Sequence, residues 1–96
     1  MTPQQLIQKA TLLLDLRKDA QGAAAALEAA IATAHSSNDV VSEIEARCFL
    51  GELLLELGDT AKAASEFSTL LGLHTSPAQE ALVSRHRETA IRALRR

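Results

Sequence analysis

The chain has 96 residues and a formal net charge of −2; 47% of its residues are apolar and two are aromatic. This length allows one domain, whose core must be filled by leucine, isoleucine, valine and alanine, a composition that favours helix. No segment has the makeup of a secretory leader, and no apolar run approaches the roughly 20 residues that span a bilayer. We therefore expect a single all-α domain, residues 1–96, that is cytoplasmic and makes no contact with a membrane.

The cysteine content and the charge distribution exclude further classes of protein. Cys48 is the one cysteine, so the chain has no internal disulfide and no need of an oxidising compartment. Residues 1–77 hold ten acids and five Lys or Arg, whereas residues 78–96 hold two acids and five arginines. This basic tail is small, and no aromatic residue lies among its arginines to stack on bases. We expect no nucleic-acid partner.

Two helices are predicted in the first part of the chain. The first begins with Thr2 as its N-cap and Pro3 at the first helical position, with Gln5 completing a capping box. Asp19 can cap the second helix, which continues to about His35. Both helices carry apolar residues at the three-and-four spacing of a buried stripe. These residues are Leu6, Ile7, Ala10, Leu13 and Leu14 in the first helix and Ala23, Leu27, Ala30, Ile31 and Ala34 in the second.

A third helix is predicted from residue 39 or 40 to Leu57. Gly58 stands where the end of a helix needs a residue in the left-handed conformation. Asp59 follows as the N-cap of a fourth helix, which extends to His74. The inward stripe of this fourth helix is expected to comprise Ala63, Ala64, Phe67, Leu70 and Leu71.

Pro77 opens a fifth helix, which is expected to keep one side in water. The residues expected to be buried in it are Leu82, Val83, Ala90, Ile91 and Leu94. Because the connections between helices are short, sequential helices are expected to pack antiparallel, as two hairpins followed by this capping helix.

The two hairpins form an internal repeat of about 40 residues. Repeat 1 covers about residues 3–37, repeat 2 about residues 39–76, and the capping helix about residues 78–95. Gly51 lies in the middle of a helix, where glycine costs about 1 kcal/mol relative to alanine. Its equivalent in repeat 1 is Ala10, which is also small. We expect both positions to be points where the second helix of a hairpin approaches the first closely, with Phe67 or Leu27 filling the space alongside.

Repeat 2 resembles the tetratricopeptide repeat. The residues that carry the resemblance are Leu50, Gly51, Leu54, Gly58, Asp59, Ala63, Phe67 and Pro77. Repeat 1 matches in spacing and has Arg17-Lys18 in place of the glycine turn, and Arg47 stands where the family usually has a large aromatic residue. The resemblance implies an α-α superhelix that binds a peptide or partner helix in a groove lined by the first helix of each hairpin. Such proteins need about three repeats to bury a continuous core, so we expect self-association or a constant partner.

No pattern typical of a catalytic or metal site is found in the sequence. His35 and His74 recur near the ends of equivalent helices, where the helix dipole favours them, without cysteines or acids at ligand spacing. His86 lies among arginines and is expected to be solvated. Cys48 has no histidine near it in sequence and is expected to be a small core residue. We expect no enzyme activity, no cofactor and no metal.

The clearest functional signal is a pair of charged stripes. Glu45, Glu52 and Glu56 are spaced seven and four apart, which confines them to a stripe roughly 40° wide on one helix. One repeat later, three arginines have the same spacing. The two stripes either pair within the chain or line a groove that binds a complementary partner or another copy. The residues predicted to line this groove are Glu45, Cys48, Glu52, Leu55, Glu56, Arg85, Arg92 and Arg96.

These observations favour a small adaptor that binds protein. Two alternatives stay open. One is a dedicated chaperone or assembly factor for a small helical client, such as a secretion subunit, which would co-purify with the chain. The other is a structural unit that assembles with itself, for which the isolated chain would already be a defined oligomer.

Overall fold

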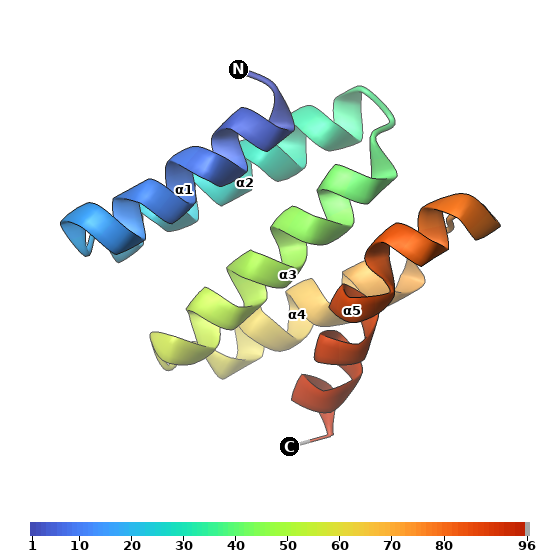
Figure 1. Ribbon diagram of the computed structural model, residues 1–96. Helices are drawn as coiled ribbons and strands as arrows, with labels where there is room; N and C mark the ends of the chain where they lie inside the picture. The colour runs from blue at the N-terminus through green and yellow to red at the C-terminus, as the bar shows by residue number, and fades with distance from the viewer. Residues whose placement is uncertain (96) are drawn as a thin grey trace.

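The computed structural model describes residues 1–95, which form five α-helices and no strand. The helices are α1 (Pro3–Arg17), α2 (Ala20–Ser36), α3 (Val40–Glu56), α4 (Thr60–Gly72) and α5 (Pro77–Leu94). Consecutive helices pack against each other as antiparallel hairpins (Figure 1). The predicted all-α fold is confirmed. Arg96, the last member of the predicted basic stripe, lies outside the described residues.

One turn motif joins the first four helices. A residue with positive φ ends each helix at intervals of 20 residues, namely Lys18 (φ 53°), Asn38 (φ 56°) and Gly58 (φ 83°). An aspartate follows in each case, and its carboxylate accepts a hydrogen bond from the backbone N–H three residues later. The turn of repeat 1 therefore shares a left-handed residue and an aspartate cap with the glycine turn of repeat 2. Its backbone hydrogen bonds differ, because the N–H groups of Lys18 and Asp19 bond four and six residues back, and those of Gly58 and Asp59 three and five residues back.

The end of α4 differs from the sequence prediction. The helix ends at Gly72 rather than at His74, because the backbone turns extended at Leu73. The Arg87 guanidinium, from α5, donates hydrogen bonds to the carbonyl oxygens of Leu70 (2.9 Å), Leu71 (3.3 Å) and Leu73 (2.7 Å). The carbonyls of Leu70 and Leu71 are among the groups that a helix C-terminus leaves without intrahelical partners, and Leu73 follows directly after the helix. Exposed His74 thus lies two residues beyond the helix.

The helices form two layers. In Figure 1, α1, α3 and α5 lie on the near side, with α2 and α4 behind them. α3 is central, because it contacts all four other helices. The shortest dimension of the molecule is 18 Å, which fits two layers of helices at interaxial distances of about 8–10 Å.

Side chains from all five helices form one core cluster. Three alanines of α2, Ala23, Ala30 and Ala34, are fully buried and let neighbouring helices approach closely. Phe67 of α4 is the largest fully buried side chain. None of the helices in residues 1–95 combines the length and apolarity that crossing a bilayer requires.

α5 buries less than its apolar pattern predicts. Val83 and Ala90 are completely buried, but Leu82 is 69% exposed, and Ile91 and Leu94 are also exposed. The reason is that α5 packs only on α3 and α4 among the described elements, so its buried stripe is narrow. The expectation that Leu82, Ile91 and Leu94 are buried is wrong, whereas the expectation that one side of α5 is exposed is confirmed.

Candidate functional site

The layer formed by α1, α3 and α5 carries two pockets, one on each side of α3. The first lies between α1 and α3 and has a volume of about 220 Å³. The second lies between α3 and α5 and has a volume of about 390 Å³. Glu52 and Glu56 line both pockets, so these two side chains form the ridge that separates them. We call the two pockets and this ridge the groove.

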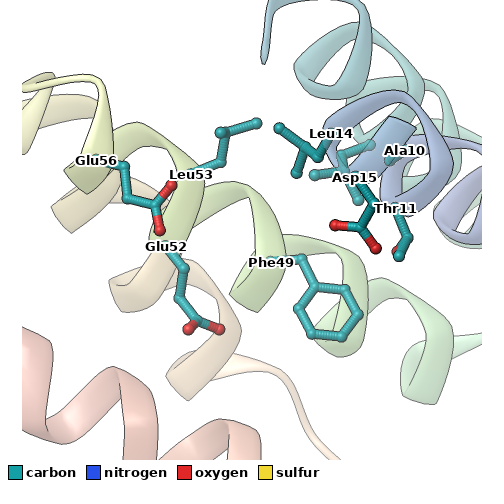
Figure 2. Close-up of a pocket in the computed structure, with 9 residues that line it drawn as sticks. Ala10, Thr11, Leu14, Asp15, Phe49, Glu52, Leu53 and Glu56 are labelled. Carbon is teal, nitrogen blue, oxygen red and sulfur yellow. The ribbon is translucent and has the colours of Figure 1, made fainter. Parts of the chain in front are cut away.

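The pocket between α1 and α3 combines an apolar floor with an acidic rim. Its apolar lining comes from Ala10, Leu14, Leu27, Phe49 and Leu53. Figure 2 shows Thr11 and Asp15 extending from α1 beside the Phe49 ring of α3, with Glu52 and Glu56 along the same helix. Phe49 is 37% exposed and lies where the apolar and the acidic parts of this lining meet. At the N-terminal side of α1, the Gln4 amide donates a 3.0 Å hydrogen bond to the Ser42 hydroxyl and ties α1 to α3.

The pocket between α3 and α5 is more polar and contains both signs of charge. Glu52 and Glu56 face Arg92 across it, while Leu55, Phe67 and Ala93 contribute apolar surface. Within residues 1–95, none of the three acids of the α3 stripe forms an ion pair with Arg85 or Arg92. The ion pairs that do form involve other residues, so the hypothesis of internal pairing between the stripes gains no support from the described side chains.

The structure brings most of the predicted groove residues together. Glu52 and Glu56 are exposed on one side of α3, and Glu45 lies on the same side in a half-buried position. Leu55 is half-buried and lines the pocket between α3 and α5. Arg92 lines that pocket, and Arg85 is exposed two turns earlier on α5. That these residues bind a partner stays a prediction.

Cys48 lies beneath the groove rather than on its surface. Its side chain is 1% exposed, and its Sγ atom lies 3.5 Å from a Glu52 carboxylate oxygen and 3.9 Å from the His86 carbonyl oxygen. Burial raises the pKa of the Cys48 thiol to about 12, and the charge and hydrogen bond of Glu52 and the charge of Glu45 add to the increase. A thiol held protonated in this way is a poor nucleophile.

Sequence reasoning missed the role of Phe49 and misplaced His86. The two rings meet edge to face, with their centroids 5.7 Å apart, and connect α3 to α5. His86 is therefore half-buried, and the expectation that it is solvated is wrong. Asp15 was also missed, because its place beside α3 depends on how two helices cross.

A second polar cluster, missed by sequence reasoning, joins α2, α3 and α4. Glu43 is 4% exposed, and its carboxylate lies 3.2 Å from the His35 Nδ1 atom and 3.0 Å from the Arg47 Nε atom. Arg47 reaches on to Glu66 of α4 at 2.8 Å. The charge of Arg47 is therefore paired within the hairpin of repeat 2. Every buried side-chain polar atom among the described residues has a hydrogen-bond partner, so the buried carboxylate of this cluster is satisfied within the fold.

No three histidine, cysteine or acidic side chains of the described residues gather closely enough to hold a metal ion. Comparisons with protein-family models, curated protein sequences and solved structures found no match to this chain. The geometry of this chain alone therefore identifies the groove as the candidate site, with a partly exposed aromatic ring and with acids that form no ion pair within residues 1–95.

Proposed function

We propose that the chain is a small tetratricopeptide-like adaptor that binds a peptide or partner helix in the groove. The proposal is supported by the arrangement of the helices, since the first helix of each hairpin and the capping helix share one layer. It is supported also by the recurrence of one turn motif at 20-residue intervals, which is the pattern of a helical repeat. We place the module in the cytoplasm, where its single buried thiol would stay reduced.

One observation carries the proposal, namely the exposure of Phe49 in a pocket with an acidic rim. Protein interfaces typically have an apolar centre with aromatic anchors, surrounded by a polar rim. Leu14 and Leu53 supply apolar walls beside the Phe49 ring, while Asp15 and Glu52 supply the rim. Cys48 is a poor candidate for a nucleophile, because burial raises the pKa of its thiol to about 12 and holds it protonated.

The test is selection of binding peptides from a phage-displayed library on the folded protein. Peptides selected on the wild type should bind the Phe49→Ala variant at least tenfold more weakly, because the aromatic anchor is gone. Leu16→Ala is the matched control, since Leu16 is 77% exposed on α1 but lies outside the groove. Peptides that bind Phe49→Ala as well as the wild type, or a library that yields no binder, would overturn the proposal.

Charge reversal provides an independent measurement. Replacing Glu45, Glu52 and Glu56 by lysine should weaken binding of the selected peptides while leaving the melting temperature close to that of the wild type. Stability should hold because Glu52 and Glu56 are exposed and Glu45 is only half-buried. Exposed charges contribute about 0–1 kcal/mol each, and none of the three acids forms an ion pair in residues 1–95. Lost stability with unchanged binding would contradict the proposed role of the stripe.

A further inference from the structure

The outward side of α5 is a basic surface with exposed apolar residues. We define the α5 surface as Leu82, Arg85, Ile91, Arg92 and Arg95. Arg92 also lines the pocket between α3 and α5 of its own chain, and the exposed acid Glu88 lies among these arginines, so the surface is basic on balance. All five side chains are exposed, and Leu82 is the most exposed apolar residue of the helix. Arginine mixed with aliphatic residues is a composition typical of protein interfaces. α5 is the last helix of the described chain, so no further described helix covers this side.

The groove has the opposite charge. Glu45, Glu52 and Glu56 lie on one side of α3, and Asp15 of α1 lines the same pocket as Glu52 and Glu56. Arg92 is the one cation among the described residues that line the two pockets, so acids outnumber bases there. None of these four carboxylates takes part in an ion pair within residues 1–95. Four neighbouring carboxylates repel one another, and a basic partner surface would relieve that repulsion. The α5 surface and the groove are therefore complementary in charge.

The spacing of the charges also matches. Seven residues separate Glu45 from Glu52, and seven separate Arg85 from Arg92, which is about 10.5 Å along a helix in both cases. If α5 lies antiparallel to α3 of another molecule, Arg85 is level with Glu52, and Arg92 is level with Glu45.

The same antiparallel alignment places an apolar side chain at the pocket. Leu82 lies one turn beyond Arg85, and so comes level with the stretch between Leu53 and Glu56, which line the pocket between α1 and α3. That pocket has a volume of about 220 Å³. A cavity of about 150 Å³ can hold benzene, so a leucine side chain fits in the pocket.

We propose that the α5 surface of one copy docks, antiparallel to α3, into the groove of a second copy. This inference rests on the proposed function, since it names this chain itself as an occupant of the same groove. The contact joins two different surfaces, so it is heterologous and leads to rings or open chains of subunits rather than to a closed two-fold dimer. Salt weakens the association, because the contact depends on exposed charges.

Two charge-reversed variants test the docking by sedimentation. The groove variant carries Glu45→Lys and Glu52→Lys, and the surface variant carries Arg85→Glu and Arg92→Glu. In each variant alone, the docking surfaces have like charges, so self-association should be at least tenfold weaker than in the wild type. In an equimolar mixture, each surface meets a groove of opposite charge, so association should return to the wild-type level and disappear at about 500 mM salt. Thermal melts of each variant confirm that it is folded.

Three results would overturn the docking. They are a wild type that stays monomeric at low salt and high concentration, variants that associate as strongly as the wild type, and a mixture that associates no better than its components. These outcomes are distinct from failure of the proposed function. A monomeric wild type that still binds selected peptides through Phe49 would keep the groove as a binding site and remove only the second copy as its occupant.

Discussion

The ring of Phe67 lies so close to Gly51 that its Cζ atom is 2.7 Å from where a Cβ atom on residue 51 would be. Two further ring atoms lie 2.8 and 3.0 Å from the same point. Phe67 is 1% exposed on α4, so a Cβ atom at residue 51 would have to displace a packed ring. The prediction that Gly51 marks a close approach between the two helices of a hairpin is confirmed.

Gly51→Ala should destabilise the protein by about 1–3 kcal/mol through overpacking against Phe67. Helix propensity alone predicts the opposite sign, with a gain of about 1 kcal/mol. Urea unfolding measures the difference. Gly72→Ala is the matched control, because Gly72 also lies in a helix and an added Cβ there meets nothing within 4 Å. If both alanine variants unfold at higher urea than the wild type, residue 51 is not in contact with the ring.

Phe67→Ala should cost about 3–5 kcal/mol, because it empties the space between α3 and α4. Small domains have about 5–15 kcal/mol of stability, so the variant should be close to unfolding. In the double variant with Gly51→Ala, the total loss should be less than the sum of the single losses, since the added methyl group then occupies vacated space. Strict additivity in urea titrations would show that the two positions do not interact.

Lys18→Gly should stabilise the protein by about 1 kcal/mol, because Lys18 adopts a left-handed conformation that costs an L-residue about 1–2 kcal/mol. Gly58→Ala should have the reverse effect of similar size, since φ at Gly58 is 83° and nothing else crowds that position. Thermal melts of the two variants measure both effects. An unchanged melting temperature for both would mean that the two turns relax without strain.

These turns show which parts of the fold are set by local sequence. Asp19 and Asp59 are predictable as N-caps, because a carboxylate at that position satisfies a free backbone N–H whatever the helix packs against. The left-handed Lys18 was not predictable in the same way, since lysine has no preference for that conformation. Two hydrogen bonds to the end of α1 hold it there, from the Lys18 N–H to the Leu14 carbonyl oxygen and from the Asp19 N–H to the Leu13 carbonyl oxygen.

The candidate site likewise contains residues that local sequence predicts and residues whose position depends on how the helices pack. The acidic stripe could be predicted because the period of a helix alone places Glu45, Glu52 and Glu56 on one side. The pocket beside it could not, since the approach of Asp15 to Phe49 depends on how α1 crosses α3. The exposure of Leu82 was missed for a related reason, because helical periodicity does not tell how many neighbours a terminal helix has.

Arg87→Lys should destabilise the protein by about 2–3 kcal/mol, although the charge is kept. A lysine cannot reproduce the fork of hydrogen bonds from Arg87 to Leu70, Leu71 and Leu73. Amide hydrogen exchange should accelerate in the last turn of α4 and at the start of α5. Arg95→Lys is the control, since Arg95 is exposed and lies beyond the last turn of α5. Equal effects of the two substitutions would contradict the capping role.

The hydrogen bonds between Thr75, Glu80 and Arg87 also make the stability of the protein depend on pH. A hydrogen bond from the Thr75 hydroxyl, together with Arg87, lowers the pKa of the Glu80 carboxyl below its ordinary value of 4.5. As the pH falls, the Glu80 carboxyl is therefore protonated at a higher pH in the unfolded chain than in the folded protein. The contribution of Glu80 to stability is complete above pH 4.5 and is lost as the pH falls through the lowered pKa. Glu80→Gln should thus flatten the acid limb of the curve of melting temperature against pH.

The Cys48 thiol should resist alkylation in the folded protein. Its pKa is raised from 9.0 to about 12, so at pH 8 the thiolate fraction is about a thousandfold below that of an ordinary cysteine. Labelling by iodoacetamide should be at least a hundredfold slower than in urea, and its rate should still be rising at pH 10. A Cys48→Ala/Ser84→Cys variant, with its thiol at an exposed position of α5, should label rapidly when folded. Fast native labelling of Cys48 that levels off below pH 9 would refute its burial beneath the groove.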